Sequence, residues 1–289
     1  PAEALRLMES DRFLIRAGVL VPITTEPVRD GAVLVSGEQI EEIGPWSGLS
    51  SRHPDLQVVD LSSQIVLPGL INAHCHLDYT RMAGGIPPKK SFSDWIKAIL
   101  AYKADWSYTD FAESWVAGAR MLQNSGTTTV LDIEAVPELL AEVQGSTPLR
   151  VVSALEMTGI HSGKDPRQIL SETTEVISTA RMREDNVALS PHSLYSTKPE
   201  LVQFAVAEAA HRNCLITMHV SESTEELEMF QKQSGPLYDW LKSQRDMSDC
   251  NGRSPVKMLD DLGALSERFI AVHGNCLSED DIERLAARG

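Results

Sequence analysis

The sequence predicts an α/β protein in which a parallel sheet follows a small β-rich module. Two observations carry this prediction. Residues 13–67 contain short apolar runs separated by turn residues, which is typical of strands. After that point, short apolar runs alternate with longer stretches of helical periodicity, as expected for βα units. Hydrophobic residues make up 42% of the 289 residues, enough for a sizeable core.

The β-rich module is expected over residues 1–64, with strands at 13–21, 32–35, 39–43 and 57–61. The tripeptide Ser36-Gly37-Glu38 lies between two of these strands and indicates a hairpin turn. Residues 65–289 then form the second domain. Its buried strands are predicted at 65–67, 127–132, 149–155, 187–190, 215–219 and 269–273.

Three helices between these strands are visible from their periodicity and end signals. The first has an apolar stripe and ends before Gly126; the stripe consists of Phe111, Trp115, Ala119 and Leu122. The second begins near Pro199, which suits a first helical turn. The third is capped by Ser278 and is expected to turn Ile282 and Leu285 toward the core.

Composition excludes several partners. Lys and Arg total 26 against 41 Asp and Glu, so the formal charge of −15 repels nucleic acids and anionic membranes. No apolar stretch approaches the roughly 20 residues that span a bilayer. The four cysteines form no CxxC pair, which fits a reducing compartment. We therefore expect a cytoplasmic protein that binds a small molecule, and leave open a homo-oligomer.

The segment Pro-Gly-Leu-Ile-Asn-Ala-His-Cys-His-Leu-Asp (68–78) places His74 and His76 two residues apart at the end of an apolar run. On a strand, residues i and i+2 face the same way, so both imidazoles can reach one ion at about 2.0–2.1 Å. Cys75 then faces the opposite side and packs. His219 also closes an apolar run, 214–218. From spacing alone, each histidine could equally be a hydrogen-bonded structural residue.

Five segments in a fixed order carry a resemblance: 68–78, 126–130 (GTTTV), 190–195 (SPHSLY), 218–222 (MHVSE) and 271–274 (AVHG). Together they resemble the amidohydrolase superfamily, in its deaminase and chlorohydrolase branch. Residues 87–96 add a similarity to aminofutalosine and S-adenosylhomocysteine deaminases. The resemblance implies a TIM-like (β/α) barrel with an N-terminal β-sandwich module and a metal site at the carboxyl ends of the strands.

The same resemblance implies one divalent ion held by His74, His76 and His219. Zinc is the expected ion, with iron and manganese as alternatives. It also makes Glu222 the general acid/base, although Glu222 begins an acidic run that could simply be a solvated helix face. His273 would act as an electrostatic partner of water or substrate, outside the main ligand set.

Two residues are expected to contact substrate. His192 would orient a heteroaromatic ring, and the alternative is a histidine that packs a loop. Trp95, within an aromatic segment after the first barrel strand, could stack on a purine-like ring or belong to the core of a short helix.

The family pattern ends early in this sequence. Six βα units are visible before Gly289, so we expect an incomplete barrel that lacks strands seven and eight and the aspartate that normally follows the eighth. Asp132 and Asp78 are the alternatives for this position, but neither matches that motif, and no fourth protein ligand is assigned.

The expected activity is that of a hydrolase acting on C–N bonds other than peptide bonds. A metal-bound hydroxide would deaminate an aminated, purine-type heteroaromatic compound. The alternatives are dechlorination of a triazine, opening of a cyclic amide, and a metal-binding but inactive or truncated homologue.

Overall fold

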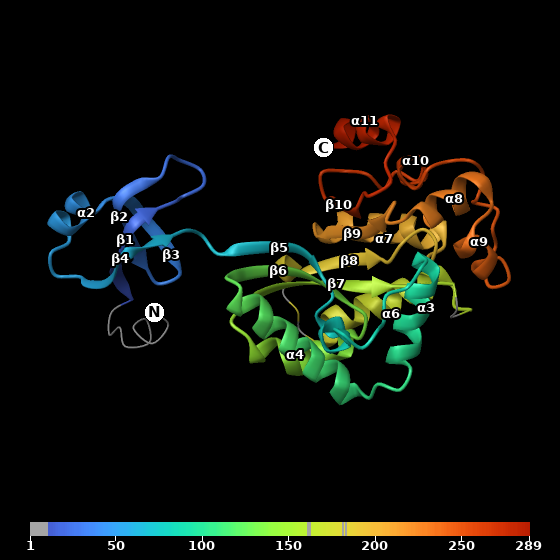
Figure 1. Cartoon of the computed structure of the whole chain (residues 1–289), viewed down its shortest axis with the longest axis horizontal. Coiled ribbons are helices and arrows are strands. Elements are labelled where there is room, and N and C mark those ends of the chain that lie inside the picture. Colours follow the sequence, from blue (N-terminus) through green and yellow to red (C-terminus); the bar gives the residue numbers. More distant parts are fainter. Residues whose placement is uncertain (1–10, 161–162, 181, 183) are drawn as a thin grey trace. The chain divides into compact units, whose positions relative to one another are not determined.

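The computed structural model describes residues 11–160, 163–180, 182 and 184–289 (Figure 1). The chain divides into two compact units between Gly69 and Leu70, five residues beyond the boundary expected from the sequence. Residues 1–10 of the expected first domain lie outside the described residues. Within the described part, no helix is long and apolar enough to cross a membrane.

In the first unit, the described residues 11–69 form a four-stranded mixed sheet and a short helix. Its elements are β1 (Arg12–Leu20), β2 (Val28–Ser36), β3 (Gln39–Pro45), α2 (Trp46–Arg52) and β4 (Gln57–Val66), and the strand order is β3-β2-β1-β4. The pairs β1–β2 and β2–β3 are antiparallel, whereas β4 runs parallel to β1. The predicted hairpin is confirmed, since Gly37 joins β2 to β3 with a φ of 54°, where glycine is favoured.

One strand prediction in this region was wrong. Residues 65–67 were expected to begin the barrel, but Ile65 and Val66 complete β4 of the first unit. They pair with Val19 and Leu20 of β1, a contact between distant parts of the chain that local hydrophobicity does not reveal. The described residues of this unit form a single sheet, so the second layer of a β-sandwich stays a prediction.

The second unit is built on a six-stranded sheet, β10-β9-β8-β7-β6-β5, in which every neighbouring pair is parallel. The strands are β5 (Leu70–Cys75), β6 (Thr127–Glu134), β7 (Arg150–Met157), β8 (Val187–Pro191), β9 (Leu215–Val220) and β10 (Phe269–His273). Chain order and spatial order coincide, as in a (β/α) barrel. All six carboxyl ends therefore lie along the same edge of the sheet.

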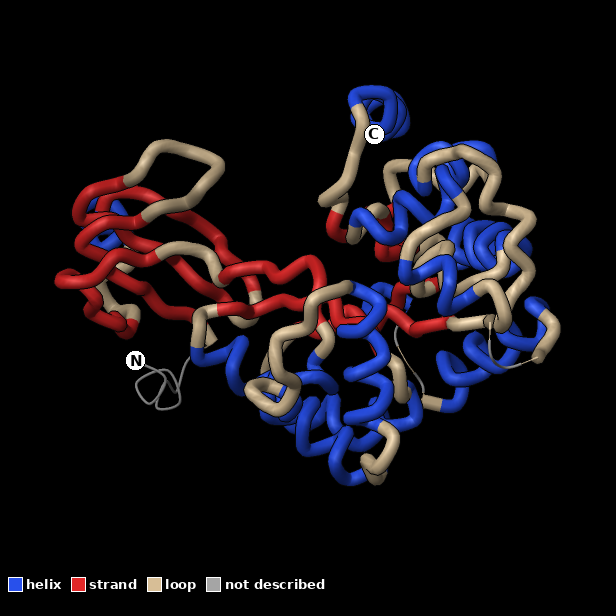
Figure 2. The backbone as a smooth tube through the Cα atoms, turned by 45° about the vertical axis from the view of Figure 1, so that its right-hand side comes forward, coloured by secondary structure: helices blue, strands red, loops and turns tan. Residues whose placement is uncertain are grey.

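Helices connect these strands along the chain (helices blue, strands red in Figure 2). The α-helices are α3 (Phe92–Lys103), α4 (Tyr108–Asn124), α5 (Leu140–Val143), α6 (Pro166–Thr179), α7 (Pro199–Arg212), α8 (Thr224–Lys232), α9 (Pro236–Leu241), α10 (Pro255–Asp261) and α11 (Glu279–Arg288). Short 3₁₀ turns are η1 (Leu77–Met82), η2 (Pro137–Leu139), η3 (Gln144–Ser146) and η4 (Glu184–Asn186).

The three predicted helices are confirmed, with one correction. The stripe of α4 packs into a buried cluster around Trp115, and α7 begins at Pro199. Ser278 caps α11, but Ile282 is 55% exposed and only Leu285 packs on the core. Asp281 takes the inward position because its carboxylate accepts hydrogen bonds from Ser278 and from buried Ser254, the N-cap of α10. Ile282 is thereby rotated about 100° away.

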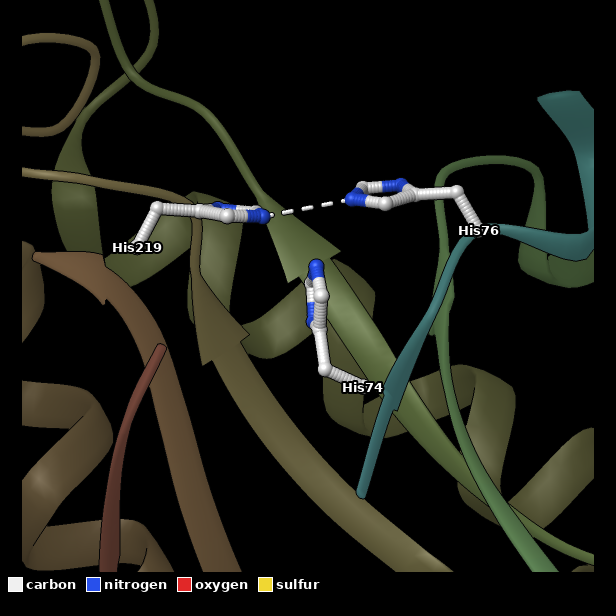
Figure 3. Close-up of side chains that lie close together, drawn as sticks. All are labelled: His74, His76 and His219. Atoms are coloured by element: carbon white, nitrogen blue, oxygen red, sulfur yellow. Dashed lines mark hydrogen bonds between the residues drawn. The ribbon is translucent and has the colours of Figure 1, made fainter. Parts of the chain in front are cut away.

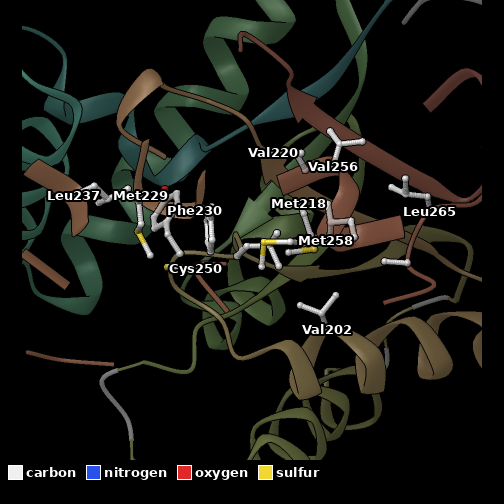
Figure 4. Close-up of a cluster of buried hydrophobic side chains, with 14 of the residues drawn as sticks. Val202, Met218, Val220, Met229, Phe230, Leu237, Cys250, Val256, Met258 and Leu265 are labelled. Carbon is white, nitrogen blue, oxygen red and sulfur yellow. The ribbon is translucent and has the colours of Figure 1, made fainter. Parts of the chain in front are cut away.

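The largest buried cluster packs helices α8, α9 and α10 against β9 (Figure 4). Met218 and Val220 of β9 lie in this cluster and are almost fully buried. Because side chains alternate along a strand, the residue between them, His219, faces the opposite side of the sheet. The core thus fixes the direction in which His219 points.

Candidate metal centre and its cavity

Three histidines meet at the carboxyl edge of the sheet. His74 is near the end of β5, His76 follows that strand, and His219 lies on β9. One nitrogen from each ring lies within 4.8 Å of the others, and Nε2 of His76 is 3.2 Å from Nε2 of His219 (Figure 3). Two nitrogens bound to one tetrahedral zinc ion at 2.0–2.1 Å would be about 3.3–3.4 Å apart. The spacing therefore fits a shared ion.

The protonation state of the three rings also suits a metal. Burial lowers the pKa of His74 to about 4, and burial lowers the pKa values of His76 and His219 as well, with neighbouring histidines adding to the shift. The rings are therefore neutral at pH 7 and keep a lone pair for ligation. Nδ1 of His74 and Nδ1 of His76 are buried and have no hydrogen-bond partner among the described residues. Three convergent neutral imidazoles form a donor set typical of zinc.

His219 is held in one tautomer by the backbone of His192. Its Nδ1–H donates to the His192 carbonyl at 2.9 Å, and its amide donates to the same oxygen at 2.9 Å. This leaves the lone pair on Nε2, the atom that faces His76. The His76 ring stacks on Tyr79 at 4.5 Å between centroids. A hydrogen bond to the ring nitrogen that does not bind the metal orients the imidazole and raises its affinity for the metal ion.

Glu222 and His273 flank the histidine cluster. Oε1 of Glu222 is 3.5 Å from Nε2 of His273, whose ring centroid is 5.3 Å from that of His219 and 5.5 Å from that of His74. Burial raises the pKa of Glu222 to about 7. The backbone turns sharply at both places, since Ser221 and His273 have φ angles of 52° and 76°. Non-glycine residues in this region are typical of sites where side-chain direction matters.

The acidic run that begins at Glu222 is not a solvated face. Glu225 and Glu226 are buried, and the carboxylate of Glu225 accepts the amides of Phe92 and Ser93 at the start of α3. Glu226 accepts the amide of Glu222 at 2.8 Å. These two carboxylates therefore hold α3 and the Glu222 loop.

A cavity of about 240 Å³ opens beside the cluster. Its polar wall includes His192, His219 and Glu222, and its apolar wall includes Trp95 and Trp240. Trp95 is 40% exposed, so its ring is available to a ligand. Its neighbours in the aromatic segment, Phe92 and Ile96, are partly buried against the core, as the packing interpretation expects, whereas stacking of Trp95 on a ring stays a prediction.

Several predictions about neighbouring residues can be checked directly. Cys75 is partly buried against the cluster around Trp115, as expected, and burial raises the pKa of its thiol to about 12. Asp132 accepts the Leu77 amide at 2.8 Å, and Asp78 forms an ion pair with Lys103 at 2.9 Å. Among the described residues, only the three histidines converge as a metal-binding group, so neither aspartate joins them.

The cavity residues that sequence reasoning missed include Tyr79, Lys103 and Glu156. Glu156 follows an apolar run at the end of a predicted strand, the same signal that identified the histidines, and could have been found. Lys103 carried no signal, because its place depends on how α3 folds over the cavity. Tyr79 sits in η1, directly after the first motif.

Known proteins that resemble this chain include several deaminases. A 5-methylthioadenosine/S-adenosylhomocysteine deaminase from Pyrococcus furiosus is 25% identical over 279 residues, covering 95% of this chain and 61% of that protein. A 5'-deoxyadenosine deaminase from Methanothermobacter thermautotrophicus is 27% identical over 268 residues, covering 90% of this chain and 57% of that protein. The chain thus spans about three fifths of the curated relatives that it matches.

Solved structures share the fold. An adenosine deaminase from Xanthomonas campestris with bound zinc has a TM-score of 0.78 at 22% identity, covering 97% of this chain and 62% of that one. A triazine hydrolase from Arthrobacter aurescens also has a TM-score of 0.78, at 20% identity, covering 97% and 64%. These likenesses confirm the predicted TIM-like α/β architecture. Residues 65–289 match the amidohydrolase family, and the chain therefore belongs to that family, as its five motifs predicted.

Proposed function

We propose that this chain forms part of a metal-dependent hydrolase that removes an amino group from a purine-type heteroaromatic small molecule. The observation that carries the proposal is the convergence of His74, His76 and His219 beside a cavity that is lined by His219, His192 and Glu222. The curated relatives named above, which are deaminases of adenine-bearing compounds, support the choice of reaction.

The donor set suits one divalent ion, with zinc favoured by three neutral imidazoles and by the zinc in the related Xanthomonas structure. Iron and manganese remain alternatives. A divalent ion held by these nitrogens supplies Lewis-acid chemistry, because it makes water acidic enough to ionise near neutral pH. No fourth protein ligand is assigned.

Glu222 is the general acid/base of the proposal. A carboxyl group whose pKa is raised to about 7 by burial can both accept and return a proton near neutral pH. Oε1 of Glu222 would take a proton from the attacking water and deliver it to a ring nitrogen as the water oxygen bonds to the amine-bearing carbon. The remaining hydroxyl proton would then pass through the same carboxylate to the amino group, and the C–N bond would break to release ammonia. His273, 3.5 Å from Oε1, would hold the carboxylate in place and contact the water or substrate.

His192 and Trp95 are proposed to bind the substrate ring. Burial lowers the pKa of His192 to about 4, so its imidazole is neutral and offers a hydrogen bond without a charge. Trp95 offers a flat apolar surface on the other side of the cavity.

The likeness to a triazine hydrolase keeps a second reaction in view, because water activated in the same way could displace chloride from a triazine. Opening of a cyclic amide and a metal-binding but inactive homologue are the further alternatives. A substrate panel scored in parallel for ammonia, chloride and carboxylate release separates the three reactions. No product from any substrate would favour the inactive homologue.

The test of mechanism compares Glu222→Gln with Glu228→Gln, a matched change at a half-exposed glutamate of the following helix. We expect Glu222→Gln to keep its metal and lose about 10²–10⁴ in turnover, with Glu228→Gln close to normal. Normal turnover in Glu222→Gln would contradict the assigned role.

We retain three further expectations from composition: a cytoplasmic location, a small-molecule partner without nucleic acid or membrane, and a homo-oligomer as an open question. The formal charge of −15 supports the second.

A further inference from the structure

Glu156 is a cavity-lining carboxylate that the mechanism above does not use. It is the next-to-last residue of β7, at the same carboxyl edge of the sheet as the histidines. Its side chain is only 14% exposed, and it lines the cavity together with His192 and Glu222. Among the described residues, no group donates a hydrogen bond to it. A carboxylate removed from water without a donor is costly, so a donor supplied by a ligand would stabilise it.

Nε2 of His192 lies 3.9 Å from Oε1 of Glu156. This separation is too long for a direct hydrogen bond. The other ring nitrogen of His192, Nδ1, is engaged with Ser196 Oγ at 2.6 Å and Ser193 Oγ at 3.1 Å. Nε2 is therefore the nitrogen left for a ligand.

The gap between these two atoms has the size of one polar group. A hydroxyl oxygen or an amine nitrogen can lie about 2.8 Å from both Oε1 and Nε2 when they are 3.9 Å apart. Such a group would donate to Glu156 and also meet His192. The arrangement therefore suits a neutral hydrogen-bond donor. An alkyl group in the same place would face a desolvated carboxylate without donating a hydrogen bond to it.

Lys103 supplies a fixed positive charge near this site. Its ammonium is held by Asp78 at 2.9 Å and lies 4.3 Å from the centroid of the Tyr79 ring. It does not bind Glu156 directly, but its charge opposes the effect of burial, which raises the pKa of Glu156 to about 7. The lysine thereby favours the ionised carboxylate, which is a hydrogen-bond acceptor only.

We propose that Glu156 is a specificity-determining residue that, with Nε2 of His192, binds a hydrogen-bond donor of the substrate, either a hydroxyl or an amino group. The proposal deepens the proposed function and rests on it for the identity of the substrate ring. It predicts that the protein selects heteroaromatic compounds that carry such a donor over analogues that lack it.

The experiment uses the zinc-loaded chain and two pairs of ligands. The hydroxyl arm compares adenosine with 2',3'-dideoxyadenosine, and the amino arm compares 2,6-diaminopurine riboside with adenosine. Binding is followed by the fluorescence of Trp95 and Trp240, which line the cavity. Turnover is followed by ammonia release, so that Kd, KM and kcat are obtained separately.

The unsubstituted chain should prefer the donor-bearing member of one pair by about 10- to 100-fold, the usual strength of a hydrogen bond to a charged group. Glu156→Gln should reduce that preference to less than about threefold, mainly through Kd and KM, with zinc content unchanged. Glu156→Asp, which keeps the charge, should retain part of it. Glu175→Gln, an exposed glutamate of α6, is the matched control and should behave as the unsubstituted chain does.

The arm in which the preference disappears identifies the donor as hydroxyl or amine. Equal preference in Glu156→Gln and in the unsubstituted chain, or no preference in either arm, would overturn the proposal. Failure of the proposed function would give a different result, because Glu222→Gln would then turn over normally or no ammonia would appear with any substrate. The fluorescence measurements would still report on Glu156 in that case.

Discussion

Replacing Gly118 by alanine should displace η1, the turn that follows the metal-binding His76, and so disturb the metal centre. Gly118 lies on the buried face of α4, against the 3₁₀ turn that begins directly after His76. A Cβ at this position would overlap the Thr80 hydroxyl and come within 3.0 Å of Leu77 Cδ2 and 3.1 Å of the Leu77 carbonyl. Ordinary contacts between carbon atoms are about 3.5–4.0 Å.

The hydroxyl cannot move freely, because it donates to the Leu77 carbonyl at 2.8 Å. Overpacking of this kind costs about 1–3 kcal/mol, whereas alanine in place of glycine favours a helix by about 0.8–1.0 kcal/mol. We expect Gly118→Ala to lower the free energy of unfolding by roughly 1 kcal/mol. The shift of η1 should also weaken zinc binding severalfold, because η1 positions His76 and the stacked Tyr79.

Urea denaturation and competition with a zinc chelator measure the two effects. Gly145→Ala is the control, since a Cβ there meets nothing within 4 Å. In a Thr80→Ala background, which removes the overlapping hydroxyl, the cost of Gly118→Ala should largely disappear. Unchanged or increased stability of the single variant, with normal zinc affinity, would refute this reasoning.

Three further predictions concern single groups. His219→Ala should reduce the metal content from about one divalent ion per chain to near zero, while His211→Ala, at the end of α7, leaves it unchanged by elemental analysis. Burial raises the pKa of Glu226 to about 8 in the folded chain, so the folded state binds more protons than the unfolded state above pH 4.5. This group should therefore lower the free energy of unfolding by up to about 1.4 kcal/mol per pH unit as pH rises from 4.5 to 8, and Glu226→Gln should remove that slope; parallel pH profiles would contradict this. Lys103→Met leaves the buried Asp78 carboxylate without its cation and should cost about 3–5 kcal/mol in urea denaturation, a loss that adding Asp78→Asn should largely reverse.

The sequence predicted those features that depend on local pattern. Five of the six barrel strands, the stripe of α4, the start of α7 at Pro199 and the cap of α11 follow from periodicity and end residues, and the structure confirms them. The 65–67 prediction failed because pairing with β1 decides which sheet these residues join. Ile282 failed for a related reason, since a hydrogen-bonded aspartate took the inward position.

The residues of the candidate site likewise divide into those that a local sequence pattern indicates and those that depend on tertiary packing. His74, His76 and His219 each close an apolar run, and the parallel sheet brings such positions to one edge. Glu156 had the same signal but no motif to draw attention to it. Lys103 could not be found, because its place depends on where α3 packs, and the buried carboxylate of Glu225 that holds the start of α3 is more than a hundred residues away in sequence.

The stacking of Tyr79 on His76 connects two equilibria. Lys103, on the helix that lines the cavity, contacts the Tyr79 ring, and that ring contacts a metal ligand. A compound that immobilises α3 therefore also restrains His76. By thermodynamic reciprocity, the factor by which such a compound increases the affinity for zinc equals the factor by which zinc increases the affinity for the compound. Loss of the ion during chelation should then be slower when the cavity is filled, so the rate of metal release reports on occupancy of the cavity even without turnover.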